Sequence, residues 1–241
     1  MDLIIKDATV VDGSGAPGFQ ADLGLRDDRI EIVGQLGNVP SSAVIQAAGK
    51  VVCPGFIDIH SHSDYNLLIN PQSESKIRQG VTTEVGGNCG YAAAPIGNQA
   101  LKERQGHYKE NFDLDLDWKT LPEYRRRLEE AKISVNYAPL VGHNTIRATV
   151  MGMENRPPSS RELTQMAALT EEAMQEGAFG ISSGLIYPPA CYAGAPELIA
   201  LCKAAAGHGG FLSCHIRSEG NRLLEALDEI ILVALSEPIM T

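Results

Sequence analysis

Residues 54–62 read Pro-Gly-Phe-Ile-Asp-Ile-His-Ser-His. The apolar run 56–60 predicts a buried strand, in which side chains alternate between two faces. Asp58, His60 and His62 are therefore expected on one face, with the two imidazoles about 6.6 Å apart along the strand. Imidazole nitrogens are common metal ligands, so this stretch predicts a metal-binding strand end.

Outward from this stretch, from about residue 52, the pattern alternates between strands and helices. This rhythm predicts a parallel sheet covered by helices, as in a TIM-like barrel or a doubly wound sheet. Ser160 is the predicted N-cap of one helix, and Gly177 follows that helix. The predicted strands are 56–60, 81–85, 135–141, 178–182 and 211–216, and the predicted helices are 74–79, 97–110, 121–132, 160–176, 195–206 and 222–235.

The first fifty residues are rich in strand formers and have turn residues between them. Asp27-Asp28 separates two short apolar runs, as in a hairpin. These strands are too few to close a domain alone. We expect residues 1–51 to form part of a small β-sandwich and residues 52–241 to form a barrel segment. The predicted strands are 3–5, 8–11, 22–25, 30–33, 44–46 and 51–52.

The amino-acid composition limits the binding partners and the cellular compartment that we expect. The 241 residues are 44% apolar and 21% charged with a net charge of −10, which is typical of a globular chain. An acidic chain with no basic cluster argues against nucleic acid or an anionic membrane as a partner. No apolar run reaches a membrane span, and the start does not resemble a signal peptide. The cysteines are scattered and odd in number, so we expect a reduced, cytoplasmic protein.

Two further strand ends carry metal-ligand side chains. Cys89 lies in a glycine loop, 86–90, directly after the strand 81–85, and His215 closes the strand 211–216. Barrel enzymes place their working residues at the carboxyl ends of strands, where a thiolate and imidazoles can share a metal. By contrast, Cys53, Cys202 and Cys214 lie in apolar segments and are expected to be buried.

Two weaker candidates have the same placement. His143 follows the strand 135–141, and Tyr187 follows the strand 178–182. Tyr187 could donate a hydrogen bond to a substrate oxygen. For both residues, ordinary loop packing is the alternative interpretation.

Taken together, these motifs resemble the amidohydrolase superfamily and, within it, the D-aminoacylase family of N-acyl-D-amino-acid deacylases. The motif Asn88-Cys89-Gly90 singles out that family, in which a cysteine replaces the usual carboxylated lysine ligand. The resemblance implies an α/β fold, a (β/α)8 barrel joined to a small β-sandwich built from both chain ends. The other motifs on which the resemblance rests are residues 54–62, 140–144, 184–189 and 215–217.

The resemblance also implies an enzyme and its site. A zinc-activated water would attack the acyl carbonyl of an N-acyl-D-amino acid, a linear amide. Cys89 and His215 would hold a tight zinc, and His60 and His62 a second, weaker metal. Tyr187 would contact the substrate near the scissile amide, and His143 is the other expected catalytic residue.

The chain departs from the family in length. The family is about twice as long and carries a further zinc-binding histidine, a catalytic aspartate and a carboxylate-binding basic residue at later positions. No histidine follows His215. We therefore expect a truncated or frame-shifted chain with about five of eight barrel units and impaired activity.

Two alternatives remain open. One is a cyclic-amide hydrolase resembling dihydroorotase or hydantoinase, which Cys89 disfavours because those enzymes use a carboxylated lysine. The other is a non-catalytic remnant that associates with other chains. The preferred D-amino acid and the oligomeric state are left open.

Overall fold

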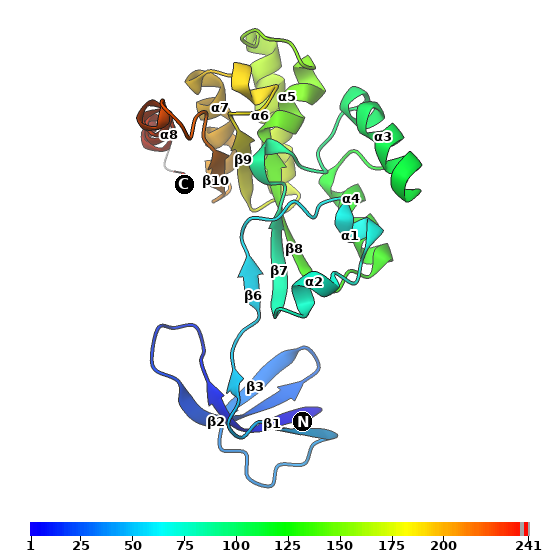
Figure 1. Ribbon diagram of the computed structural model, residues 1–241, viewed down its shortest axis with the longest axis vertical. Coiled ribbons are helices and arrows are strands. Elements are labelled where there is room, and N and C mark those ends of the chain that lie inside the picture. Colours follow the sequence, from blue (N-terminus) through cyan, green and yellow to red (C-terminus); the bar gives the residue numbers. More distant parts are fainter. Residues whose placement is uncertain (237–238, 241) are drawn as a thin grey trace. The chain divides into compact units, whose positions relative to one another are not determined.

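The computed structural model describes residues 1–236, 239 and 240 (Figure 1). The chain divides into two units, one comprising Met1–Phe56 and the other beginning at Ile57. The assignment of residues 1–51 and 52–241 to a sandwich and a barrel stays a prediction. Glu237, Pro238 and Thr241, at the end of the second range, lie outside the described residues.

The first unit is one five-stranded sheet in the order β3-β2-β1-β4, with β5 pairing β1. Asp27 turns the β2–β3 hairpin with a φ of 51°. Two strands expected at 3–5 and 8–11 form a single strand, interrupted by a register shift between Ile5 and Ala8. The strands are β1 (Leu3–Val10), β2 (Phe19–Arg26), β3 (Arg29–Gly34), β4 (Ala43–Gln46) and β5 (Val51–Val52).

The second sheet carries the candidate site. Its strand order, β10-β9-β8-β7-β6, follows the chain order, and β7 to β10 pair in parallel. This confirms the predicted α/β fold, and the sequential order is that of a barrel rather than of a doubly wound sheet. The strands are β6 (Phe56–Asp58), β7 (Val81–Gly86), β8 (Asn136–Gly142), β9 (Gly180–Gly184) and β10 (Phe211–His215).

Helices follow the strands (Figure 1) and bury a core around Trp118, Tyr124, Met166 and Leu201. Trp118 is fully buried, and its indole N–H donates to the carbonyl of Ala93 over 3.0 Å. The helices are α1 (Asn66–Ile69), α2 (Glu74–Ile77), α3 (Asn98–Phe112), α4 (Leu121–Ala131), α5 (His143–Met151), α6 (Ser160–Gln175), α7 (Ala195–Ala206) and α8 (Leu223–Ser236). Two short 3₁₀ helices are η1 (Asn88–Gly90) and η2 (Ala190–Tyr192).

The N-cap of α6 differs by one residue from the expectation. Ser159, rather than Ser160, accepts from the N–H of Glu162, while the Glu162 carboxylate accepts from the N–H of Ser159. Both serines suit a cap, and the glutamate three residues after Ser159 completes a capping box only with that residue.

Candidate metal centre

The histidine pair lies beyond the end of a strand. Strand β6 ends at Asp58, so the expected alternation does not extend to His60 and His62. An Asp58 carboxylate oxygen accepts a hydrogen bond from the N–H of His60 over 3.2 Å. This local bond competes with the strand ladder and turns the chain. The two imidazoles are instead brought together by the loop, with ring centroids 5.3 Å apart.

A buried carboxylate anchors this loop to the next strand. Glu84 of β7 is fully buried and accepts hydrogen bonds from the hydroxyls of Ser61 and Ser63, which flank His62. Lys76 pairs with Asp58 and lies 3.9 Å from Glu84. The loop backbone is therefore held on both sides of His62.

Cys89 lies in a strained loop after β7. It has a φ of 53°, between Gly87 and Gly90 at φ of 78° and 79°. Such conformations favour glycine, and a cysteine keeps one only where its surroundings impose it. Here Ser182 of β9 accepts from the N–H of Gly90 over 2.9 Å and donates to the carbonyl of Gly87. The neighbouring strand thus sets the direction of the thiol.

Cys89 lies between two imidazoles from distant parts of the chain. Its Sγ is 3.5 Å from Nε2 of His60 and 3.7 Å from Nδ1 of His215. Zinc bonds of about 2.3 Å to sulfur and about 2.0–2.1 Å to nitrogen, at a tetrahedral angle, separate two such ligand atoms by about 3.6 Å. The ligand atoms of His60, His62 and Cys89 also lie within 4.8 Å of one another. These donors therefore fit a zinc ion.

The surroundings of the ligand side chains affect their protonation. The other ring nitrogen of His215, Nε2, lies 3.4 Å from Glu219. The pKa of His60 is lowered by burial and by neighbouring His62, and burial raises the pKa of the Cys89 thiol. A neutral imidazole is the form that binds a metal, so the lowered pKa of His60 favours ligation, whereas the raised pKa of Cys89 by itself disfavours the thiolate form.

Tyr187 lies beside this cluster. Its ring contacts that of His215 edge-on, with centroids 5.1 Å apart, and its side chain is 38% exposed. The tyrosine thus borders the metal ligands while remaining accessible to a small molecule.

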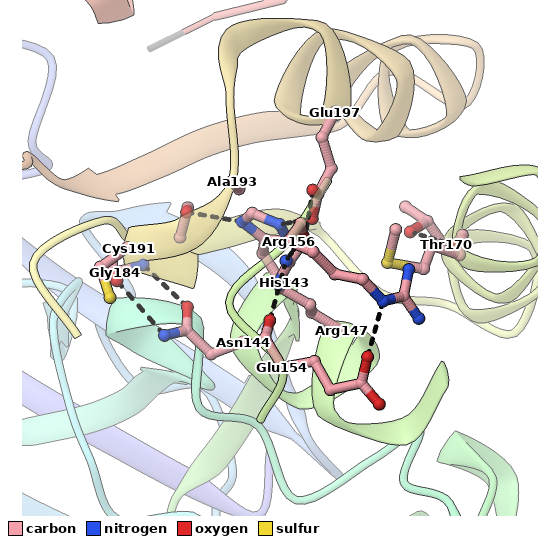
Figure 2. Close-up of polar contacts among 12 residues, drawn as sticks. His143, Asn144, Arg147, Glu154, Arg156, Thr170, Gly184, Cys191, Ala193 and Glu197 are labelled. Atoms are coloured by element: carbon pink, nitrogen blue, oxygen red, sulfur yellow. Dashed lines mark hydrogen bonds and ion pairs between the residues drawn. The ribbon is translucent and has the colours of Figure 1, made fainter. Parts of the chain in front are cut away.

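His143, by contrast, bonds to side chains inside the fold (Figure 2). The residue is fully buried, with Nδ1 2.9 Å from the hydroxyl of Ser183 and Nε2 2.9 Å from Glu197. Glu197 also pairs with buried Arg147. The expected catalytic role of His143 stays a prediction, since neither ring nitrogen contacts Cys89, His60 or His215.

A cavity of about 310 Å³ opens beside His62. Tyr65 and Tyr91 line it, and the Arg104 guanidinium carbon lies 5.9 Å from the centroid of each of their rings. Arg104 also donates to the hydroxyl of Tyr65 over 2.7 Å. The cavity therefore combines aromatic walls with a positive charge next to the metal ligands.

Other cysteines and polar residues differ in part from expectation. Cys202 is buried and Cys214 half-buried, but Cys53 is exposed because it follows the short strand β5 and lies outside both cores. Asn88 belongs to the motif that carries the resemblance, and it donates to the carbonyl of Val85 over 2.9 Å, whereas the contribution of Ser182 to the Cys89 loop was not expected. Only the tertiary structure, which places β9 against this loop, reveals that contribution.

Comparison with known proteins identifies the family. The model of the amidohydrolase family matches residues 43–218. The chain belongs to the amidohydrolase family. Among the described residues of this amidohydrolase, no helix is both long and apolar enough to span a membrane.

Individual relatives of this amidohydrolase agree with the family. D-aminoacylase from Alcaligenes xylosoxydans xylosoxydans is 40% identical over 95% of this chain and 47% of its own length. A solved D-aminoacylase with a binuclear metal centre has a TM-score of 0.90 at 39% identity, covering 99% of this chain and 50% of that one. N-acyl-D-glutamate deacylase from Bordetella bronchiseptica, complexed with zinc and a phosphonate inhibitor, has a TM-score of 0.90 at 35% identity, with the same coverage.

These matches confirm the resemblance seen in the motifs and the partial TIM-like barrel. The amidohydrolase chain spans about half the length of the relatives it matches.

Proposed function

We propose that this chain supplies the metal-binding part of a zinc-dependent hydrolase of N-acyl-D-amino acids. The observation that carries the proposal is the position of the Cys89 sulfur, 3.5 Å and 3.7 Å from one nitrogen each of His60 and His215. The named relatives, a D-aminoacylase and a zinc-bound N-acyl-D-glutamate deacylase, support the substrate class.

Within this proposal, Cys89 and His215 hold the tight zinc, and His60 and His62 form the weaker second position. The division itself is what the family resemblance implies; the binuclear centre described for the D-aminoacylase relative supports two metal positions, and the Cys89 sulfur lies within reach of both His60 and His215. These residues would hold a zinc ion, which would supply Lewis-acid chemistry toward an amide carbonyl and a water molecule.

The remaining residues bind and orient the substrate. The hydroxyl of Tyr187 donates a hydrogen bond to a substrate oxygen, as its exposure and its contact with His215 allow. The cavity beside His62 receives part of the small molecule, with Tyr65 and Tyr91 contacting apolar groups. In this division Cys89 and His215 give the tight zinc two of the three protein ligands that a catalytic zinc usually takes. Because the chain spans about half the length of its relatives, we expect slow turnover from this chain alone.

The test compares Cys89→Ser with the control Cys53→Ser. The control removes an exposed thiol that is not one of the proposed metal ligands. We expect Cys89→Ser to weaken zinc binding by at least about 100-fold, since even partners behind the ligands typically contribute 10- to 100-fold. Competition with a chromophoric chelator measures the affinity, and Cys53→Ser should match the wild type.

Hydrolysis assays separate the substrate classes. With zinc, the wild type should release amine from N-acetyl-D-amino acids faster than from the L-enantiomers, and should not open hydantoins. Unchanged zinc affinity in Cys89→Ser, or preferential opening of hydantoins, would overturn the proposal.

A further inference from the structure

Three consecutive polar residues begin helix α5 directly after strand β8. His143, Asn144 and Thr145 are each fully buried. Buried polar side chains must find hydrogen-bond partners, since an unpaired one is costly. His143 and Asn144 both have partners in β9, and the three residues together also reach α7, the backbone of Tyr187 and the backbone of residues 90–92, so this turn connects several parts of the site.

The side-chain amide of Asn144 is bonded at both ends (Figure 2). Its Nδ2 donates to the carbonyls of Gly184 and Tyr187 over 3.2 and 3.3 Å, and its Oδ1 accepts from the N–H of Gly184 over 3.1 Å. The same amide thus holds both ends of the turn that carries Tyr187.

Asn144 and its neighbour also touch the Cys89 loop. A Cβ placed on Gly90 would lie 1.8 Å from Oδ1 of Asn144, so the loop backbone packs directly on this amide. Thr145 donates to the carbonyl of Gly90 over 3.4 Å and accepts from the N–H of Ala92 over 3.1 Å. In turn, a Cβ on Gly184 would lie 2.3 Å from the carbonyl oxygen of Cys89.

His143 connects the first turn of α5 to two further elements. Its contacts with Ser183 and Glu197 connect α5 to β9 and α7. Glu197 is 2% exposed, and its charge is balanced by fully buried Arg147. These contacts tie α5 to its neighbours, although Nε of Arg147 is buried without a hydrogen-bond partner among the described residues.

We propose that Asn144 is a positioning residue that holds the Tyr187 turn against the Cys89 loop. The inference rests on the proposed function in taking Cys89 and Tyr187 as parts of one site. Loss of the amide N–H donors would release the carbonyls of Gly184 and Tyr187, and the loop that packs on Gly184 would lose its support.

The test replaces Asn144 with aspartate, which keeps the shape and the acceptor but removes both donors. Asn136→Asp is the matched control, because Asn136 is exposed at the other end of β8 and donates to the carbonyl of Thr82 over 3.1 Å. Thr145→Val is a second variant that removes the hydroxyl contacts with Gly90 and Ala92, together with the hydrogen bond that this hydroxyl accepts from Arg104 over 3.3 Å. Circular dichroism checks that each variant folds.

The first readout needs no metal. Iodoacetamide labelling of Cys89, followed by peptide mass spectrometry, reports opening of the loop, and buried Cys202 in the same digest reports opening of the whole unit. We expect Asn144→Asp to label about tenfold faster at Cys89 with no change at Cys202, because only local hydrogen bonds are lost. Asn136→Asp should label as the wild type does.

The second readout is Co²⁺ binding, followed by the absorption of the thiolate–cobalt bond. We expect Asn144→Asp to weaken this binding about tenfold or more, as for other residues that orient metal ligands. The inference would be overturned if Asn144→Asp and Thr145→Val fold and show the labelling rate and the Co²⁺ affinity of the wild type. It would also be overturned if labelling became faster by the same factor at Cys89 and at Cys202. A wild type that binds no Co²⁺ would contradict the proposed function, and the labelling rates would still decide the role of Asn144.

Discussion

At the scale of single residues, burial controls the charge of side chains around the metal ligands. Asp64 is 4% exposed, and its Oδ1 accepts from the hydroxyl of Tyr137 over 2.8 Å. Burial raises the pKa of Asp64 above its usual value of 3.8, more than the hydrogen bond from Tyr137 lowers it. The ionised carboxylate is therefore a cost to the folded state at neutral pH.

Asp64→Asn should stabilise the metal-free protein at pH 7, because asparagine keeps the shape without the buried charge. The folded-state pKa is raised, so the folded wild type binds a proton more readily than the unfolded chain and gains stability as the pH falls toward 3.8. The gain in melting temperature, about 2–4 °C at pH 7, should therefore shrink in acid. Calorimetry in the presence of a chelator measures it, and a gain that grows in acid would contradict this account.

At the scale of elements, local signals at the helix ends decide where the helices begin. Helix α6 starts at a capping box that joins Ser159 and Glu162, and α4 starts at one that joins Thr120 and Glu123. Each box satisfies backbone N–H groups that have no partner within the helix. These ends depend on residues three apart and not on the rest of the fold.

Ser159→Ala should destabilise the protein by about 1 kcal/mol, as expected for an N-cap. In a domain of this size that corresponds to a melting temperature lower by roughly 2–4 °C. Ser160→Ala, one residue later, should have little effect, and neither change should alter zinc binding. Thermal unfolding followed by circular dichroism compares the two variants, and an equal loss from both would refute the assigned cap.

At the scale of the whole molecule, helix α8 exposes large apolar side chains. Leu224 is 74% exposed and Leu235 82%, with Ile231 and Leu232 more than half exposed. Neighbouring apolar side chains open to water favour association. The isolated chain should therefore associate with itself as its concentration rises.

Replacing Leu224 and Leu235 with glutamate should shift the chain toward monomer, because it removes two apolar groups and adds charge. The control places the same two glutamates at exposed Gln99 and Asn111 of α3, which matches the change in net charge. Size-exclusion chromatography with light scattering measures the mass across a concentration series. Equal dissociation in both double variants would mean that charge, and not the apolar face of α8, is responsible.

Much of the fold could be predicted from patterns within short segments. Helix α7 has the bounds expected for it, and each of the five expected barrel strands is present within a few residues. Apolar periodicity, glycine at helix ends and capping pairs act over one or two turns, so a linear sequence displays them. The metal-ligand residue types and their places after strands were visible for the same reason.

The arrangement of those residues required the tertiary structure. The predicted strand extent to His60 was wrong, since β6 ends at Asp58, but the expected convergence of His60 and His62 is present and comes from the loop. His143 bonds to Glu197, which lies 54 positions later, and Cys89 faces His215, 126 positions later. The sequence alone therefore determined the βα order and the kinds of ligand. Which side chains face one another was decided by the packing of β7, β9 and β10, because hydrogen-bond partners and buried neighbours come from segments far apart in the chain.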